Sequence, residues 1–147
     1  MCILGIKEII EISKPRIVIL LVITAVTSMY AASKLIGPEL DTWGLIHIII
    51  AGGLASAGSS ALNHYYDRDI DPLMTRTSTR PIPSGRIKPN SVLIYGLVVS
   101  VISVVYGALA LNFVSASFIA LGIFFYVIIY TAWLKRLNSS NIVIGGF

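Results

Sequence analysis

Long apolar runs alternate with short polar segments along this chain. The first run covers 17–33, and charge-free stretches then cover 42–66 and 89–134. Because a membrane-spanning helix needs about 20 residues, the second stretch holds one span and the third holds two. Polar Asn112 marks the break between those two. The pattern therefore predicts four spans, at about 17–33, 43–62, 91–111 and 116–134.

The composition supports a membrane protein. Apolar residues make up 56% of the 147 residues and charged residues 12%, and the mean hydropathy is +0.86. Ordinary soluble domains are less apolar and more charged. The first run resembles a signal-peptide core, but three further runs follow it, so we expect a retained span. The predicted fold class is all-α, a polytopic bundle of transmembrane helices.

Two further segments have helical features. Ile6, Ile9 and Ile10 repeat at helical spacing among charged residues, which is typical of a short helix lying on the membrane surface. Pro15 separates this helix from the first span. The 43–62 span is rich in glycine, alanine and serine. Small residues let helices approach closely in lipid, so we expect this span inside the bundle.

Basic residues are distributed unevenly between the two ends of the predicted bundle. Four spans place the N-terminus, the 63–90 loop and the C-terminal tail on one side. Lys34 is the one basic residue on the other side, and ten of the eleven lie with the loop and the termini. This asymmetry predicts that both termini and the loop are cytoplasmic. The placement explains the net charge of +4 as a topology signal. We therefore expect membrane lipid, and no nucleic acid, as a partner.

An acidic motif follows the second span. Asn63, Asp67 and Asp71 are spaced by four, so on a continued helix they form one stripe with offsets of about 40°. Asp69 points to the opposite side, and Pro72 ends the helix near Asp71. Carboxylates at a helix C-terminus are repelled by its dipole. A hard divalent cation such as Mg²⁺ would compensate them; the alternative is a solvated acidic helix end.

The loop after this motif supplies positive charge. Its basic residues are Arg76, Arg80, Arg86 and Lys88, and prolines interrupt it. Arginine forks match phosphate oxygens, and proline stiffens the loop that presents them. Carboxylates, a metal and arginines together predict a diphosphate site. Taken alone, the loop could equally be a topology signal or contact lipid headgroups.

These residues resemble the UbiA-type superfamily of intramembrane prenyltransferases, whose first aspartate-rich motif is matched by Asn63, Asp67 and Asp71. The resemblance is closest to the branch that farnesylates haem. It extends to Asp69-Ile70-Asp71-Pro72-Leu73-Met74-Thr75-Arg76-Thr77, Arg80-Pro81, Lys14-Pro15-Arg16, Leu134-Lys135-Arg136 and Asn141-Ile142-Val143-Ile144-Gly145-Gly146. His64 stands where quinone-making members commonly carry Asp. Lys135 lies one residue too far from Tyr130 for the family's Tyr-x-x-x-Lys element.

The resemblance implies a reaction, a cofactor and a set of binding residues. A farnesyl group passes from farnesyl diphosphate to a vinyl group of haem B, and water adds there to give haem O. Asn63, Asp67 and Asp71 are implied to hold Mg²⁺ against the diphosphate. The residues implied to clamp its oxygens are Arg76, Arg80 and Lys135, with Arg86 and Lys88 as further candidates.

The two histidines differ in their distance from this motif. His47 lies sixteen residues before Asn63, about 24 Å away along a helix, and we interpret it as interfacial or hydrogen-bonded within the bundle. His64 lies beside the motif, and imidazole is a common haem-iron ligand. It nevertheless points about 100° away from Asn63. A structural role is therefore favoured over haem contact.

Several functional alternatives stay open. The family fold has about nine spans and a second aspartate motif, so we expect these 147 residues to be an N-terminal part that is inactive alone. A C-terminal half or second subunit would complete it. The alternatives are another polyprenyltransferase acting on a quinone or lipid precursor, an inactive fragment, and a transporter-like membrane protein. Against a transporter, the carboxylates lie beyond the predicted span rather than within it.

Overall fold

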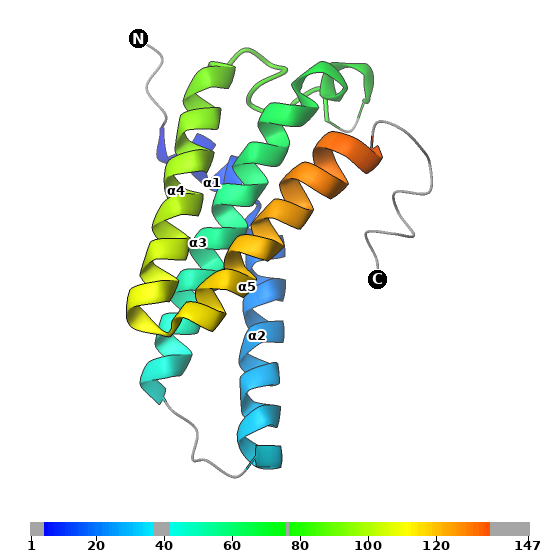
Figure 1. Cartoon of the computed structure of the whole chain (residues 1–147). Helices are drawn as coiled ribbons and strands as arrows, with labels where there is room; N and C mark the ends of the chain where they lie inside the picture. Colours follow the sequence, from blue (N-terminus) through cyan, green and yellow to red (C-terminus); the bar gives the residue numbers. More distant parts are fainter. Residues whose placement is uncertain (1–4, 37–41, 76, 136–147) are drawn as a thin grey trace.

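The structure, a computed structural model, describes residues 5–36, 42–75 and 77–135, and the regular elements in these ranges are all helical. The long helices lie side by side as a bundle (Figure 1). The elements are α1 (Ile6–Ser13), α2 (Pro15–Ile36), α3 (Thr42–Tyr66), the 3₁₀ turns η1 (Asp67–Asp69) and η2 (Asp71–Leu73), α4 (Pro89–Ala110), α5 (Phe113–Phe124) and a π-helix, η3 (Phe125–Leu134). Within these ranges, four helical segments are long and apolar enough to cross a membrane. The all-α prediction with four candidate spans is confirmed.

Helix α3 lies at the centre of the bundle and packs along α4 through small residues. A Cβ atom added at Gly58 would lie 3.1 Å from the carbonyl oxygen of Gly96, and one added at Gly96 would lie 3.1 Å from that of Gly58. The hydroxyl of Ser103 on α4 donates to the carbonyl of Ala51, 2.9 Å away. This close approach requires glycine at both positions. The expectation that α3 is interior is confirmed.

The break between the last two spans falls at the predicted residue. Asn112 precedes α5 with extended backbone, and its side chain accepts a hydrogen bond from the backbone N–H of Ser115 at 2.8 Å. An amide oxygen at this position caps a helix by satisfying one of its free N–H groups. Helix α5 then continues without interruption into the π-helix η3.

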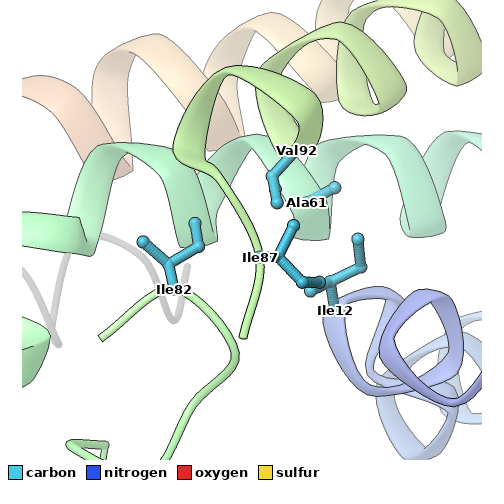
Figure 2. Packing of buried hydrophobic residues seen from close by; sticks show 5 residues of the cluster. All are labelled: Ile12, Ala61, Ile82, Ile87 and Val92. Carbon is cyan, nitrogen blue, oxygen red and sulfur yellow. The ribbon is translucent and has the colours of Figure 1, made fainter. Parts of the chain in front are cut away.

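Helix α1 is more than a surface anchor. Ile6 and Ile10 are 80% and 54% exposed, as expected for a helix lying on a surface, but Ile12 is fully buried. Figure 2 shows Ile12 against a cluster with Ala61 of α3, Val92 of α4, and Ile82 and Ile87 of the loop. Apolar contact thus fastens α1 and the loop to the same end of the bundle.

The N-terminal helix, the loop and the end of η3 meet at one end of the molecule (Figure 1). Polar contacts join them there, between Lys14 and Asn63, Glu11 and Arg86, and Lys135 and Asp67. The predicted residues Arg76 and Arg136 and the 141–146 segment lie outside the described residues. The motif and most of its basic candidates are therefore assembled by tertiary contacts at a single end.

Candidate functional site

The end of α3 differs from the expected continuous helix. The α-helix stops at Tyr66 and two 3₁₀ turns follow. The backbone N–H groups of Ile70, Leu73 and Met74 each bond to a carbonyl three residues earlier, at 3.0, 3.0 and 3.3 Å. Pro72 has no N–H to donate to an α-helical carbonyl, which favours the tighter turn. The prediction that the α-helix reaches Asp71 was wrong.

The three residues of the predicted motif are nevertheless all buried. Asn63, Asp67 and Asp71 are 4%, 1% and 2% exposed, whereas Asp69 is exposed. An ionised carboxylate is stable away from water only when a positive charge or several donors compensate it. Asp67 and Asp71 should therefore each have a cationic partner.

A different basic side chain contacts each of these residues. The Nζ atom of Lys135, at the end of η3, lies 2.6 Å from Oδ2 of Asp67. The Nη1 atom of Arg80 lies 2.9 Å from both carboxylate oxygens of Asp71. The Nζ atom of Lys14 donates to Oδ1 of Asn63 at 2.7 Å. We call these six residues the acid–base cluster.

Two residues of this end of the bundle were missed by sequence reasoning. From the sequence, Lys14 was noted only as part of the Lys14-Pro15-Arg16 resemblance and was given no role in the site. It joins α1 to α2 in a left-handed conformation with φ of 50°. Thr131 of η3 is 1% exposed and accepts a hydrogen bond from Nδ2 of Asn63 at 3.2 Å. A threonine in an apolar run carries no sequence signal of such a contact.

The environment of Lys14 disfavours its charged form. Burial lowers the pKa of its ammonium group to about 8, and repulsion from Arg80 and then Lys135 acts in the same direction. Attraction to Asp67 and Asp71 opposes that shift. Three cations are therefore packed around two carboxylates and one amide. The excess of positive charge suits an anion with several oxygens.

The donor set also fits a hard divalent cation. Two carboxylates and an amide oxygen are ligands that Mg²⁺ accepts, and Mg²⁺ is commonly held by one or two carboxylates together with substrate phosphates. Within the described ranges, no group of three or more His, Cys, Asp or Glu side chains is placed to hold a metal. A cation here would thus depend on Asn63 and on phosphate oxygens to complete its coordination.

Of the remaining predicted diphosphate residues, the two that the structure describes lie outside this cluster. Arg86 forms two hydrogen bonds, of 2.8 and 3.0 Å, to the carboxylate of Glu11 at the surface. That hydrogen bonding raises the pKa of the Arg86 guanidinium. Lys88 is exposed just before α4. The structure therefore brings Arg80 and Lys135 to the buried carboxylates and places Arg86 and Lys88 elsewhere.

The two histidines have separate surroundings. Nδ1 of His47 lies 2.7 Å from the hydroxyl of Tyr106, which confirms its interpretation as hydrogen-bonded within the bundle. His64 is 2% exposed, and neither ring nitrogen has a hydrogen-bond partner among the described residues. The protein encloses the ring on all sides, a setting typical of a structural residue.

An apolar groove begins one residue from the acidic motif. It has a volume of about 420 Å³ and lies between α3, α4 and the α5–η3 helix. Tyr66, the residue before Asp67, lines it together with Leu62, Leu97, Val101, Phe124 and Val127. Val127 and Thr131 are four residues apart on η3 and are both buried. The groove and the acid–base cluster are thus formed in part by neighbouring residues of the same elements, α3 and η3.

Comparison with known proteins identifies a family for this chain. A model of the UbiA prenyltransferase family matches residues 20–147. The chain is 67% identical to protoheme IX farnesyltransferase 1 of Cenarchaeum symbiosum over 97% of its own length and 49% of the relative. It is 50% identical to protoheme IX farnesyltransferase of Agrobacterium fabrum over 97% of its length and 44% of the relative. The chain thus spans about half the length of these relatives. No solved structure matches it.

Proposed function

The chain belongs to the UbiA prenyltransferase family, and from this membership we propose that it is the N-terminal part of an enzyme that farnesylates haem. The reaction would join the farnesyl group of farnesyl diphosphate to a vinyl group of haem B, giving haem O. The relatives named above as protoheme IX farnesyltransferases support the choice of acceptor. The observation that carries the proposal is the acid–base cluster, in which buried carboxylates and cations meet at one end of the bundle.

The cluster would act on the leaving diphosphate. The farnesyl C–O bond must ionise, and the diphosphate gains charge as it leaves, so groups that stabilise that charge lower the barrier. We propose that Asn63, Asp67 and Asp71 would hold Mg²⁺, which supplies further neutralisation of the diphosphate when bound. Arg80 and Lys135 would bind diphosphate oxygens through charge-assisted hydrogen bonds. Lys14, which contacts Asn63 at 2.7 Å, would add a third cation.

The apolar groove would accept the farnesyl tail. Its walls are mostly aliphatic and aromatic side chains, and they include Tyr66, the residue before Asp67. A diphosphate held by the cluster would thus leave its hydrocarbon tail within reach of the groove. An apolar wall also shields an allylic cation from stray water. Burial excludes His64 from this surface, so we assign it a packing role in α3.

We further propose that this end of the bundle faces the cytoplasm, because ten of the eleven basic residues cluster there in the sequence. The test is cysteine labelling of intact cells after Cys2→Ala. Thr79→Cys should react with a membrane-impermeant maleimide only after lysis, because Thr79 is exposed on the loop. Leu35→Cys, at a residue 86% exposed at the far end of α2, should react in intact cells. The reverse pattern would contradict the orientation.

Haem analysis tests the function. The chain is expressed in a strain that lacks haem O synthase, alone and together with the C-terminal half of the Cenarchaeum symbiosum relative. We expect haem O only on co-expression, because the diphosphate must be neutralised from two opposed sides and one carboxylate cluster supplies one of them.

The matched control is Asp67→Asn with the same C-terminal half, which should abolish the product. Haem O made by the chain alone would contradict the need for a second half. Absence of haem O in both arms, with both polypeptides present in the membrane, would contradict the proposed function. A prenylated quinone precursor in place of haem O would indicate a different acceptor.

A further inference from the structure

A line of hydrogen bonds crosses from the junction of α1 and α2 through α3 to η3. Lys14 Nζ donates to Asn63 Oδ1 at 2.7 Å, and Asn63 Nδ2 donates to Thr131 Oγ1 at 3.2 Å. The Thr131 hydroxyl in turn donates to the backbone carbonyl of Tyr126 at 2.8 Å. Asn63 and Thr131 are 4% and 1% exposed. Three elements are thus linked through a single buried amide.

The two ends of this line impose the same orientation on Asn63. A threonine hydroxyl has one proton, and a backbone carbonyl only accepts, so the proton of Thr131 is committed to Tyr126. Its oxygen can then only accept, and only the NH₂ group of Asn63 can donate to it. The ammonium of Lys14 has donors alone and therefore requires the amide oxygen. The oxygen of Asn63 must point toward Lys14 and away from η3.

The π-helix determines where the Thr131 hydroxyl lies. Its acceptor, Tyr126, is five residues earlier, which is the π-helical repeat. In α2 of the same chain, Thr24 and Thr27 instead bond to the carbonyls four residues earlier, Leu20 and Ile23. Those bonds are the usual pattern for threonine in an α-helix. The wider turn of η3 therefore sets the direction from which Thr131 meets Asn63.

We propose that Thr131 is a positioning residue for the diphosphate site. It holds the NH₂ group of Asn63 and so presents the amide oxygen to the cation that Asn63, Asp67 and Asp71 would share. This inference rests on the proposed function, since it concerns the same cation. Thr131 acts through Asn63 and contacts neither the diphosphate nor the farnesyl group.

The test compares three variants. Thr131→Val keeps the shape of the side chain but removes the hydroxyl, and Thr131→Ser restores the hydroxyl. Thr24→Val is the matched control, because it removes a threonine-to-carbonyl hydrogen bond remote from the site. Each chain is assembled with the C-terminal half used above, and farnesyl diphosphate binding is titrated with Mg²⁺. Hydrogen exchange of the Asn63 side-chain amide is followed by NMR on the chain alone.

We expect Thr131→Val to raise the half-saturating Mg²⁺ concentration about fivefold, as for the loss of one net hydrogen bond, and to speed exchange of the Asn63 amide protons. Thr131→Ser and Thr24→Val should stay close to wild type in both measurements. Equal effects of Thr131→Val and Thr24→Val would overturn the inference. So would a Thr131→Ser variant as impaired as Thr131→Val, because packing and not the hydroxyl would then matter.

The two measurements separate this inference from the proposed function. Unchanged exchange of the Asn63 amide in Thr131→Val would refute the positioning role even if wild type binds farnesyl diphosphate with Mg²⁺. Absence of Mg²⁺-dependent binding by the wild-type assembly would refute the proposed function. The cation role assigned to Asn63, and hence the positioning role of Thr131, would fall with it, whatever the exchange rates.

Discussion

Arg80 and Arg86 belong to the same loop, and each pairs with a carboxylate, but their surroundings differ. Arg80 contacts Asp71, whose side chain is 3% exposed. Arg86 contacts Glu11, whose side chain is 38% exposed. The nitrogen–oxygen distances are nearly equal, 2.9 and 2.8 Å. Burial rather than contact geometry therefore distinguishes an arginine of the candidate site from one that ties α1 to the loop.

The loop backbone explains this separation. Pro81 and Ile82, directly after Arg80, are buried against the bundle. Gly85 then turns the chain with φ of +74°, a conformation that suits glycine. The backbone N–H of Ile87 returns to the carbonyl of Pro81 at 3.1 Å. This closed turn leaves Arg80 beside the buried motif and Arg86 at the surface.

The energetic consequences of the two pairs differ in kind. Removing one partner of a buried pair leaves a charge without compensation and typically costs about 3–5 kcal/mol. Exposed pairs contribute about 0.2–1 kcal/mol and are screened by salt. The same substitution in the two arginines should therefore have distinct effects. Substitution of the buried carboxylates Asp67 and Asp71 should have a still larger effect.

The largest expected effect comes from the carboxylates. Asp67→Ala and Asp71→Ala should each reduce Mg²⁺-dependent farnesyl diphosphate binding and turnover by about 10²-fold or more, as for other groups that stabilise developing charge. Asp69→Ala is the matched control, because Asp69 lies in the same segment but is exposed, and it should stay within about threefold, the effect of a surface substitution. Binding is measured on the chain assembled with the C-terminal half.

If Asp69→Ala were the most damaging of the three substitutions, the grouping of Asn63 with Asp67 and Asp71 would be wrong. The stability of the same variants is measured separately from binding. Thermal unfolding should show that Asp67→Ala and Asp71→Ala destabilise the bundle, since each leaves Lys135 or Arg80 without its carboxylate.

The sequence predicted the features that depend on local pattern. Apolar runs located the four candidate spans, and Asn112 marked the break before α5. The spacing of Asn63, Asp67 and Asp71 identified three side chains that the structure buries together. These inferences succeeded because they depend on the length of each apolar run and on the spacing of nearby residues, which are local properties of the chain. The α-helix nevertheless ended at Tyr66, since Pro72 and the 3₁₀ bonds change the local geometry.

Contacts between distant elements were less accessible from sequence. Lys14 and Asn63 are 49 residues apart, and Asn63 and Thr131 are 68 residues apart. No spacing rule connects such positions. The π-helix at 125–134 lies within an apolar run. The composition of that run does not distinguish a π-helix from an α-helix. The resemblance placed Arg80 ahead of Arg86, but the physical reason, the anchoring of the loop through Ile82 and Ile87, lies in tertiary contacts.

The smaller and more selective effect concerns the two arginines. Arg80→Met should destabilise the assembled protein and weaken farnesyl diphosphate binding, because it leaves Asp71 buried beside an apolar side chain. Arg86→Met removes an exposed partner of Glu11 and should change binding by less than about twofold. Unfolding temperatures and binding are compared for both variants at low and high salt.

Salt provides the decisive contrast, because ions screen exposed charges over about 10 Å at 0.1 M and over about 3 Å at 1 M. The difference in unfolding temperature between wild type and Arg86→Met should nearly vanish at high salt, since the Glu11 pair is weakened in wild type as well. The difference for Arg80→Met should persist, because Asp71 is shielded from ions by the protein around it. If both differences vanished together, the Asp71 pair would be as accessible to solvent as the Glu11 pair. Arg80 would then have no stronger claim than Arg86 to a place in the diphosphate site.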